Sequence, residues 1–268
     1  MSNRLARAAA VLAAATALGL AAAPLAQAAD SPSAPTAADL AAARSAGQSP
    51  AVLDQLGHFF ARKGVPPTQP LGLSPADEAA AATAAAPRLT GETVPVYTLD
   101  AGFVAGRPGA EVATVEFTAT KAVAADGRSA SVWTAKSGGS WRVVNIASGG
   151  DESDYAARAA ADGGTAFREP QINAWYELRA GRVLPLDDAA RRSVGEHGLT
   201  VAGYQHLVQQ RYGDKLPGSA YDRSGRAGGF ATDAGPAGAD RTPLLTAGAA
   251  LGVTALTGTA LALRRRRR

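Results

Sequence analysis

Residues 111–146 read EVATVEFTATKAVAADGRSASVWTAKSGGSWRVVNI, and this stretch decides the fold. The runs 111–123 and 129–136 are rich in Val, Thr and aromatic residues, which favour β-strands. Between them lies Asp126-Gly127, a dipeptide that favours tight hairpin turns. The pattern predicts two antiparallel strands joined by a short turn.

Further strands are expected before and after this hairpin. Serines and glycines at 137–140 predict a second turn into a strand at 141–146, and 94–99 is expected to be an earlier strand. We therefore expect an antiparallel meander of three or four strands. A helix from 151 to about 161 is expected next, and then a hairpin formed by 172–178 and 182–186.

Helices are expected on both sides of the meander. Ser49-Pro50 and Ser74-Pro75 place a capping serine before a proline, which favours the first helical turn. Asp187 and Thr200 are in capping positions before two further apolar-patterned segments, which end near 194 and 212. The expected fold class is α+β, with an antiparallel β-meander packed with flanking helices. A helix followed by a curved meander is also similar to cystatin-like and NTF2-like folds, which implies no activity.

The two ends of the chain carry addressing signals. Arg4 and Arg7 precede an apolar run at 8–23, and small residues around Ala28 resemble a signal-peptidase site after Ala28 or Ala29. An uncleaved N-terminal anchor is the alternative. The segment 244–263 has no charged residue and is long enough to span a bilayer as a helix. Because five arginines follow it, we expect that end to stay in the cytoplasm. The alternative is an exported protein that this weakly hydrophobic tail does not anchor.

The expected organisation follows from these boundaries. It comprises a signal peptide at 1–28, a disordered leader at 29–48, N-terminal helices at 49–87, an α+β extracytoplasmic domain at 88–217, a flexible stalk at 218–243, a transmembrane helix at 244–263 and a cytoplasmic basic tail at 264–268.

Charge and cysteine content exclude several classes of function. The chain has 27 basic and 23 acidic residues, but seven arginines lie in the signal peptide and the tail. The rest is therefore slightly acidic, which gives no reason to expect nucleic acid as a partner. The chain has no cysteine, so disulfides, thiolate nucleophiles and zinc–cysteine sites are excluded.

Local motifs give no catalytic or metal centre. The histidines, His58, His197 and His206, form no zinc-binding pair, and we interpret them as surface or hydrogen-bonded residues. The acidic run 151–154 could hold calcium, but capping of the following helix explains it better. The segment 187–212 has the outline of a DNA-binding helix-turn-helix, but two helices covering a sheet are the better interpretation. No catalytic, cofactor-binding or metal-binding residue is assigned.

Three further patterns are weak. Residues 216–220 are similar to a sortase signal but lie 24 residues before the predicted span. Gly248 and Gly252 form a Gly-x-x-x-Gly pattern that permits close helix pairing. The aromatic residues, Trp133, Trp141, Trp175 and Tyr176, could line a ligand groove but are interpreted mainly as core residues.

The alanine-rich, cysteine-free composition resembles that of secreted actinobacterial proteins. The stretches 94–150 and 167–178 resemble uncharacterised exported, C-terminally membrane-anchored proteins of such bacteria. This resemblance implies no activity and no site.

The favoured hypothesis is a membrane-anchored, non-enzymatic binding or accessory module of the cell envelope, with its N-terminal domain outside the cell. Its expected partners are the membrane, through one C-terminal span, and an envelope protein or cell-wall ligand. One alternative is a surface hydrolase of cell-wall glycan that uses paired carboxylates such as Glu169 and Glu177, with Trp175 and Tyr176 as a sugar platform. Another is an accessory subunit of a membrane complex.

Overall fold

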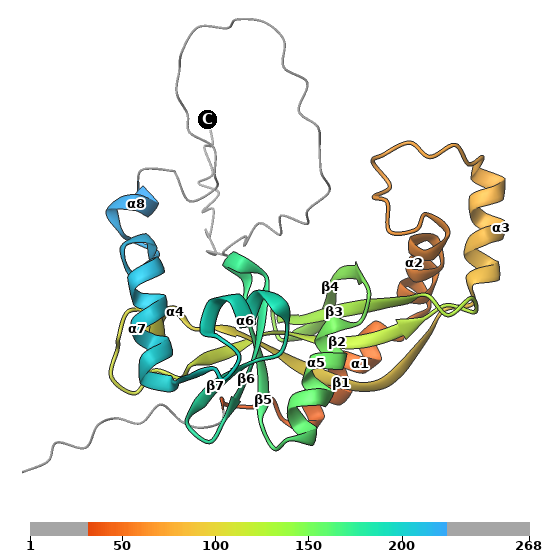
Figure 1. The fold of residues 1–268 in the computed structure, drawn as a ribbon. Coiled ribbons are helices and arrows are strands. Elements are labelled where there is room, and N and C mark those ends of the chain that lie inside the picture. The colour runs from red at the N-terminus through yellow and green to blue at the C-terminus, as the bar shows by residue number, and fades with distance from the viewer. Residues whose placement is uncertain (1–31, 224–268) are drawn as a thin grey trace, which may run out of the picture.

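The computed structural model describes residues 32–223, which form an α+β fold around one eight-stranded mixed sheet (Figure 1). The strand order is β4-β3-β2-β1-β5-β6-β7-β8. The strands are β1 (Arg88–Leu99), β2 (Ala113–Val123), β3 (Ser129–Ser137), β4 (Ser140–Ser148), β5 (Thr165–Glu169), β6 (Ala174–Arg179), β7 (Arg182–Pro185) and β8 (Leu199–Thr200). The helices are α1 (Ala37–Gly47), α2 (Pro50–Ala61), α3 (Pro75–Ala85), α4 (Ala101–Val104), α5 (Asp151–Ala161), α6 (Asp188–Val194), α7 (Val201–Tyr212) and α8 (Ala220–Arg223), with 3-10 turns at η1 (Pro170–Ile172) and η2 (Gly213–Lys215).

The predicted meander is confirmed as β1 to β4, whose neighbours all pair antiparallel. Its central turn forms as expected, because Gly127 adopts a φ of +86° and Asp126 Oδ1 accepts a hydrogen bond from the backbone N–H of Arg128. The hairpin of β6 and β7 is also confirmed.

The sheet as a whole is mixed, not purely antiparallel, because a strand that the sequence analysis missed joins its two halves. Strand β5 pairs parallel with β1 and antiparallel with β6. The parallel contact is short and comprises only Tyr97 with Phe167 and Thr98 with Arg168. Beyond Tyr97, toward the N-terminal end of β1, the two strands have no further pairing.

The predicted leader at 29–48 is a second correction, because α1 occupies 37–47. Thr36 caps this helix by accepting a hydrogen bond from the N–H of Asp39, and Ala43 is fully buried. Gly47 lies so close to Leu89 and Val132 that a side chain there would be in van der Waals contact with both. The helix is thus held by small residues packed closely on the meander, which hydrophobic patterning does not reveal.

Three apolar clusters divide between the two faces of the sheet. Helix α5 covers one face, where Ala159 packs with Phe117, Trp133 and Trp175. Strand alternation sends the neighbouring residues to the opposite face, where Val132 packs with α2 and Tyr176 packs with α6 and α7. The predicted helices α2, α3, α5, α6 and α7 are confirmed.

The addressing segments at 1–28, 244–263 and 264–268, and most of the predicted stalk, lie outside the described residues. Within residues 32–223, no helix has the length and apolar character needed to cross a membrane.

Candidate functional site

A groove lies beside the part of β1 that has no partner in β5. Its volume is about 510 Å³, and it is lined by β1, by one side of α5 and by the first residues of β5. We call it the α5 groove. A groove of this size is within the range of small-ligand sites.

Small residues on α5 form one wall of this groove. Ser153, Ala156, Ala157 and Ala160 line it, and their spacing places them along one side of the helix. The adjacent side of α5 carries Glu152 and Ala159, which are buried. The helix is therefore fixed to the sheet by one side and leaves space beside β1 with the other.

Strand β1 forms the opposite wall, through Val94, Tyr97 and the residues around an irregularity in its pairing with β2. Thr90 and Thr93 pair with adjacent residues of β2, so Gly91 and Glu92 bulge out of the ladder. Gly91 has a φ of +62°, which favours glycine, and its carbonyl accepts a hydrogen bond from Arg44 Nη1 at 2.8 Å. Pro95, also in the groove wall, has no N–H.

The groove also contains polar side chains from β1, β2 and α5. Lys121 Nζ donates to Asp154 Oδ1 at 2.8 Å, and Glu92, which is exposed, has no side-chain partner among residues 32–223. Ser153 Oγ is buried and also lacks a partner within the described part of the chain. The groove thus contains donors and acceptors: Asp154 is paired with Lys121, whereas Glu92 and the Ser153 hydroxyl have no partner within the described residues.

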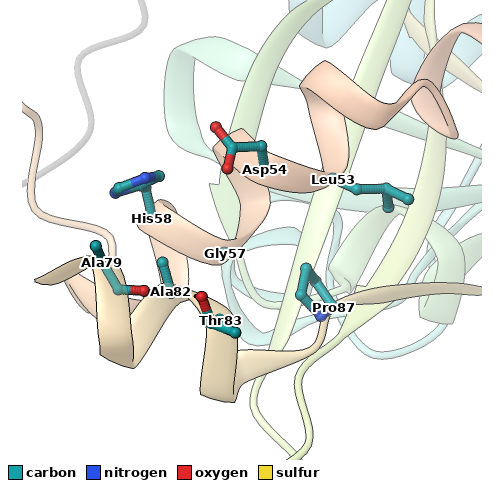
Figure 2. Close-up of a pocket in the computed structure, with 8 residues that line it drawn as sticks. All are labelled: Leu53, Asp54, Gly57, His58, Ala79, Ala82, Thr83 and Pro87. Carbon is teal, nitrogen blue, oxygen red and sulfur yellow. Dashed lines mark hydrogen bonds between the residues drawn. The ribbon is translucent and has the colours of Figure 1, made fainter.

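A second, smaller groove of about 380 Å³ lies between α2 and α3. Figure 2 shows the residues that line it, with Asp54 and His58 on α2 and Ala82 and Thr83 on α3. The helices pack closely here, and the absence of a side chain at Gly57 allows this: a Cβ atom at that position would lie 2.8 Å from the carbonyl oxygen of Ala82.

Glu78 connects these two helices. His58 Nδ1 lies 3.0 Å from Glu78 Oε1, and Arg62 Nη1 donates to Glu78 Oε2 at 2.7 Å. These hydrogen bonds, from His58 first, lower the pKa of Glu78 below its usual range. The hydroxyl of Thr83 is already bonded to the carbonyl of Ala79, so the histidine–carboxylate pair meets no free nucleophile there. This cluster holds α3 against α2.

The most buried acid of the described residues is Glu169, at the end of β5, which is fully inaccessible to solvent. Its carboxylate accepts hydrogen bonds from three tyrosine hydroxyls: Tyr176 at 2.7 Å, Tyr204 at 3.1 Å and Tyr212 at 2.5 Å. Arg211 Nη1 lies 3.6 Å from Oε1 of the same carboxylate. Burial, together with this carboxylate, raises the pKa of all three tyrosines, which therefore stay protonated as donors. We call this the tyrosine cluster; it attaches α7 to the sheet.

The paired-carboxylate hypothesis is not supported by these positions. Glu169 pairs with Ala174 across β5 and β6, whereas Glu177 pairs with Ala166. Ala174 belongs to the core under α7 and Ala166 to the core under α5, so the two acids project from opposite faces of the sheet. The expected sugar platform is absent too, because Trp175 and Tyr176 are buried in those same two cores.

The other motifs lie apart from the α5 groove, except the acidic run. Asp154 borders the groove, within the first turn of α5. His206 lies beside Gln210 on α7, and His197 is exposed in the turn before β8. Residues 32–223 contain no group of three His, Asp or Glu side chains placed to hold a metal ion.

The remaining motifs are mostly structural. Helices α6 and α7, the supposed helix-turn-helix, contribute Val194 and Val208 to the sheet core. Of the four candidate aromatic residues, Trp133, Trp175 and Tyr176 are buried core residues, and Trp141 lies on edge strand β4. Residues 216–220 form the turn into α8.

No protein-family model, no curated protein and no solved structure matches this chain.

Proposed function

We propose that this protein is a non-enzymatic binding module of the cell envelope, held at the membrane by 244–263, and that its ligand binds in the α5 groove. The observation that carries the proposal is the groove itself. On one side it is bordered by residues of β1 that have no partner in β5, and on the other side mainly by alanines of α5.

Two features support binding over catalysis. The two carboxylates considered for a hydrolase, Glu169 and Glu177, lie on opposite faces of the sheet, and no hydroxyl in the groove is hydrogen-bonded to a base among the described residues. The predicted signal peptide and basic tail support an extracytoplasmic location for the groove, where an envelope protein or wall component is the ligand.

Photo-cross-linking in intact cells tests the proposal. A benzophenone amino acid replaces Ala157, which lines the groove, or Ala161, an exposed alanine of the same helix outside it. A discrete adduct from position 157 that position 161 does not give supports binding in the groove. Equal adducts from both positions, or none from either, contradict it.

A further inference from the structure

We infer that the α5 groove binds an extended peptide by strand addition to β1, and that this peptide carries a basic side chain beside Glu92. This inference rests on the proposed function, because it names the class of ligand for the same groove.

The unpaired edge of β1 is the first part of the argument. Strand β1 is twelve residues long and pairs with β2 along nearly its whole length, but β5 joins its other edge only at Tyr97 and Thr98. Residues 90–96 therefore have no strand partner on that edge, although several of them line the groove. Backbone N–H and C=O groups on such an edge are a template for another strand.

The helix beside this edge is the second part. Ala156, Ala157 and Ala160 stand across the groove from β1, and their methyl groups leave room for a chain to lie between helix and strand. An extended peptide satisfies both walls, because its backbone bonds to the strand while alternate side chains meet the helix. A compact polar ligand would leave the strand edge or the alanines without contacts.

Two features of β1 limit the length of chain that can pair with its unpaired edge. The bulge at Gly91 and Glu92 interrupts the regular edge, and Pro95 cannot donate a hydrogen bond. Bulges and prolines are the devices by which natural edge strands prevent unlimited pairing. The edge can therefore bind a segment of a few residues but does not favour open-ended sheet growth.

The charges of the groove indicate which side chain the peptide carries. Glu92 at the groove has no partner among the described residues, whereas Lys121 is already paired with Asp154. The groove thus contains two carboxylates and one ammonium group. A lysine or arginine of the ligand beside Glu92 balances this charge, whereas an acidic side chain there is repelled.

The test uses the full chain in detergent micelles and a fluorescein-labelled peptide of one lysine followed by alternating Val and Thr. Two further peptides carry N-methyl groups on alternate residues, one on the odd and one on the even positions. Because successive N–H groups of a strand point to opposite edges, only one series should lose binding, by tenfold or more. Equal binding of both series, or no binding of the parent peptide, overturns strand addition.

Matched variants locate the site. Ala157→Leu should weaken peptide binding at least tenfold, and Ala161→Leu, which adds the same side chain outside the groove, should not. Glu92→Lys should weaken binding, whereas Glu196→Lys, at an exposed acid in the turn after α6, should leave it unchanged. If neither Ala157→Leu nor Glu92→Lys weakens peptide binding, the inference is contradicted.

The outcomes separate this inference from the proposed function. If position 157 cross-links in cells but the peptide does not bind, the groove is a binding site and strand addition is wrong. If position 157 does not cross-link and Ala157→Leu changes no binding, both are wrong.

Discussion

Replacing Glu169 with alanine should destabilise the fold more than any other single acid substitution in residues 32–223. The carboxylate is fully buried and accepts three tyrosine hydroxyls, and Arg211 lies nearby. Hydrogen bonds to a charged group contribute about 1.5–3 kcal/mol each, but they are not additive within one network. Removing one partner of a buried charged network typically costs about 3–5 kcal/mol, which is the loss we expect in the free energy of unfolding.

The loss should appear in both thermal and chemical unfolding. For a domain of this size, each 1 kcal/mol corresponds to roughly 2–4 °C in Tm, so Glu169→Ala should lower Tm by roughly 6–20 °C. Glu169→Gln keeps one acceptor oxygen and the shape of the side chain, and should fall between the alanine variant and the wild type. Near-ultraviolet circular dichroism follows the environment of the tyrosines directly.

Glu196→Ala is the control, because Glu196 is exposed and should change the free energy of unfolding by less than about 0.5 kcal/mol. A Glu169→Ala variant that unfolds together with this control would refute the view that the tyrosine cluster holds α7 on the sheet.

Three further predictions follow from particular groups. Burial raises the pKa of Glu177, so its contribution to stability is fully present below pH 4.5 and is lost as the pH rises through the folded-state pKa. The change in urea unfolding free energy caused by Glu177→Gln should therefore be more favourable at pH 7 than at pH 4, and an equal change at both pH values would contradict this. The pKa values of the clustered tyrosines are raised, so their contribution to stability is present below pH 10 and is lost above it. Alkaline unfolding of the wild type should begin above pH 10 and should depend less steeply on pH in Tyr204→Phe, whereas identical unfolding profiles would contradict this prediction. Gly57→Ala should destabilise the contact of α2 with α3 despite the higher helix propensity of alanine, because the added methyl group meets the Ala82 carbonyl. Limited proteolysis of the 66–74 connection should become faster, whereas the control Gly72→Ala, at a position where nothing lies within 4 Å, should leave the rate of proteolysis unchanged.

The meander and most helices could be predicted because their signals are local. Asp126-Gly127 fixes one hairpin, and Ser74, Asp187 and Thr200 each accept the capping hydrogen bond that the sequence implies. Strand β5 has no such signal. It is five residues long, and its alternation is concealed because Glu169 is buried among tyrosines.

The candidate site could not be predicted for a related reason. The α5 groove lies beside the part of β1 that has no partner in β5, and the paired residues of these strands are about 70 residues apart in the chain. Its wall is made of alanines, which indicate a helix but not an empty space beside it. The acids singled out from the sequence, Glu169 and Glu177, proved to be buried on opposite faces of the sheet.

The proposed role in the cell envelope depends on the domain lying outside the cytoplasm, and protease shaving of protoplasts tests this most directly. One epitope tag is placed after Asp30 and another after Arg268. The account predicts that protease removes the first tag while the second stays protected in the membrane fraction. Protection of both tags would contradict it, because the α5 groove would then face the cytoplasm, and release of both into the medium would show that 244–263 does not anchor the chain.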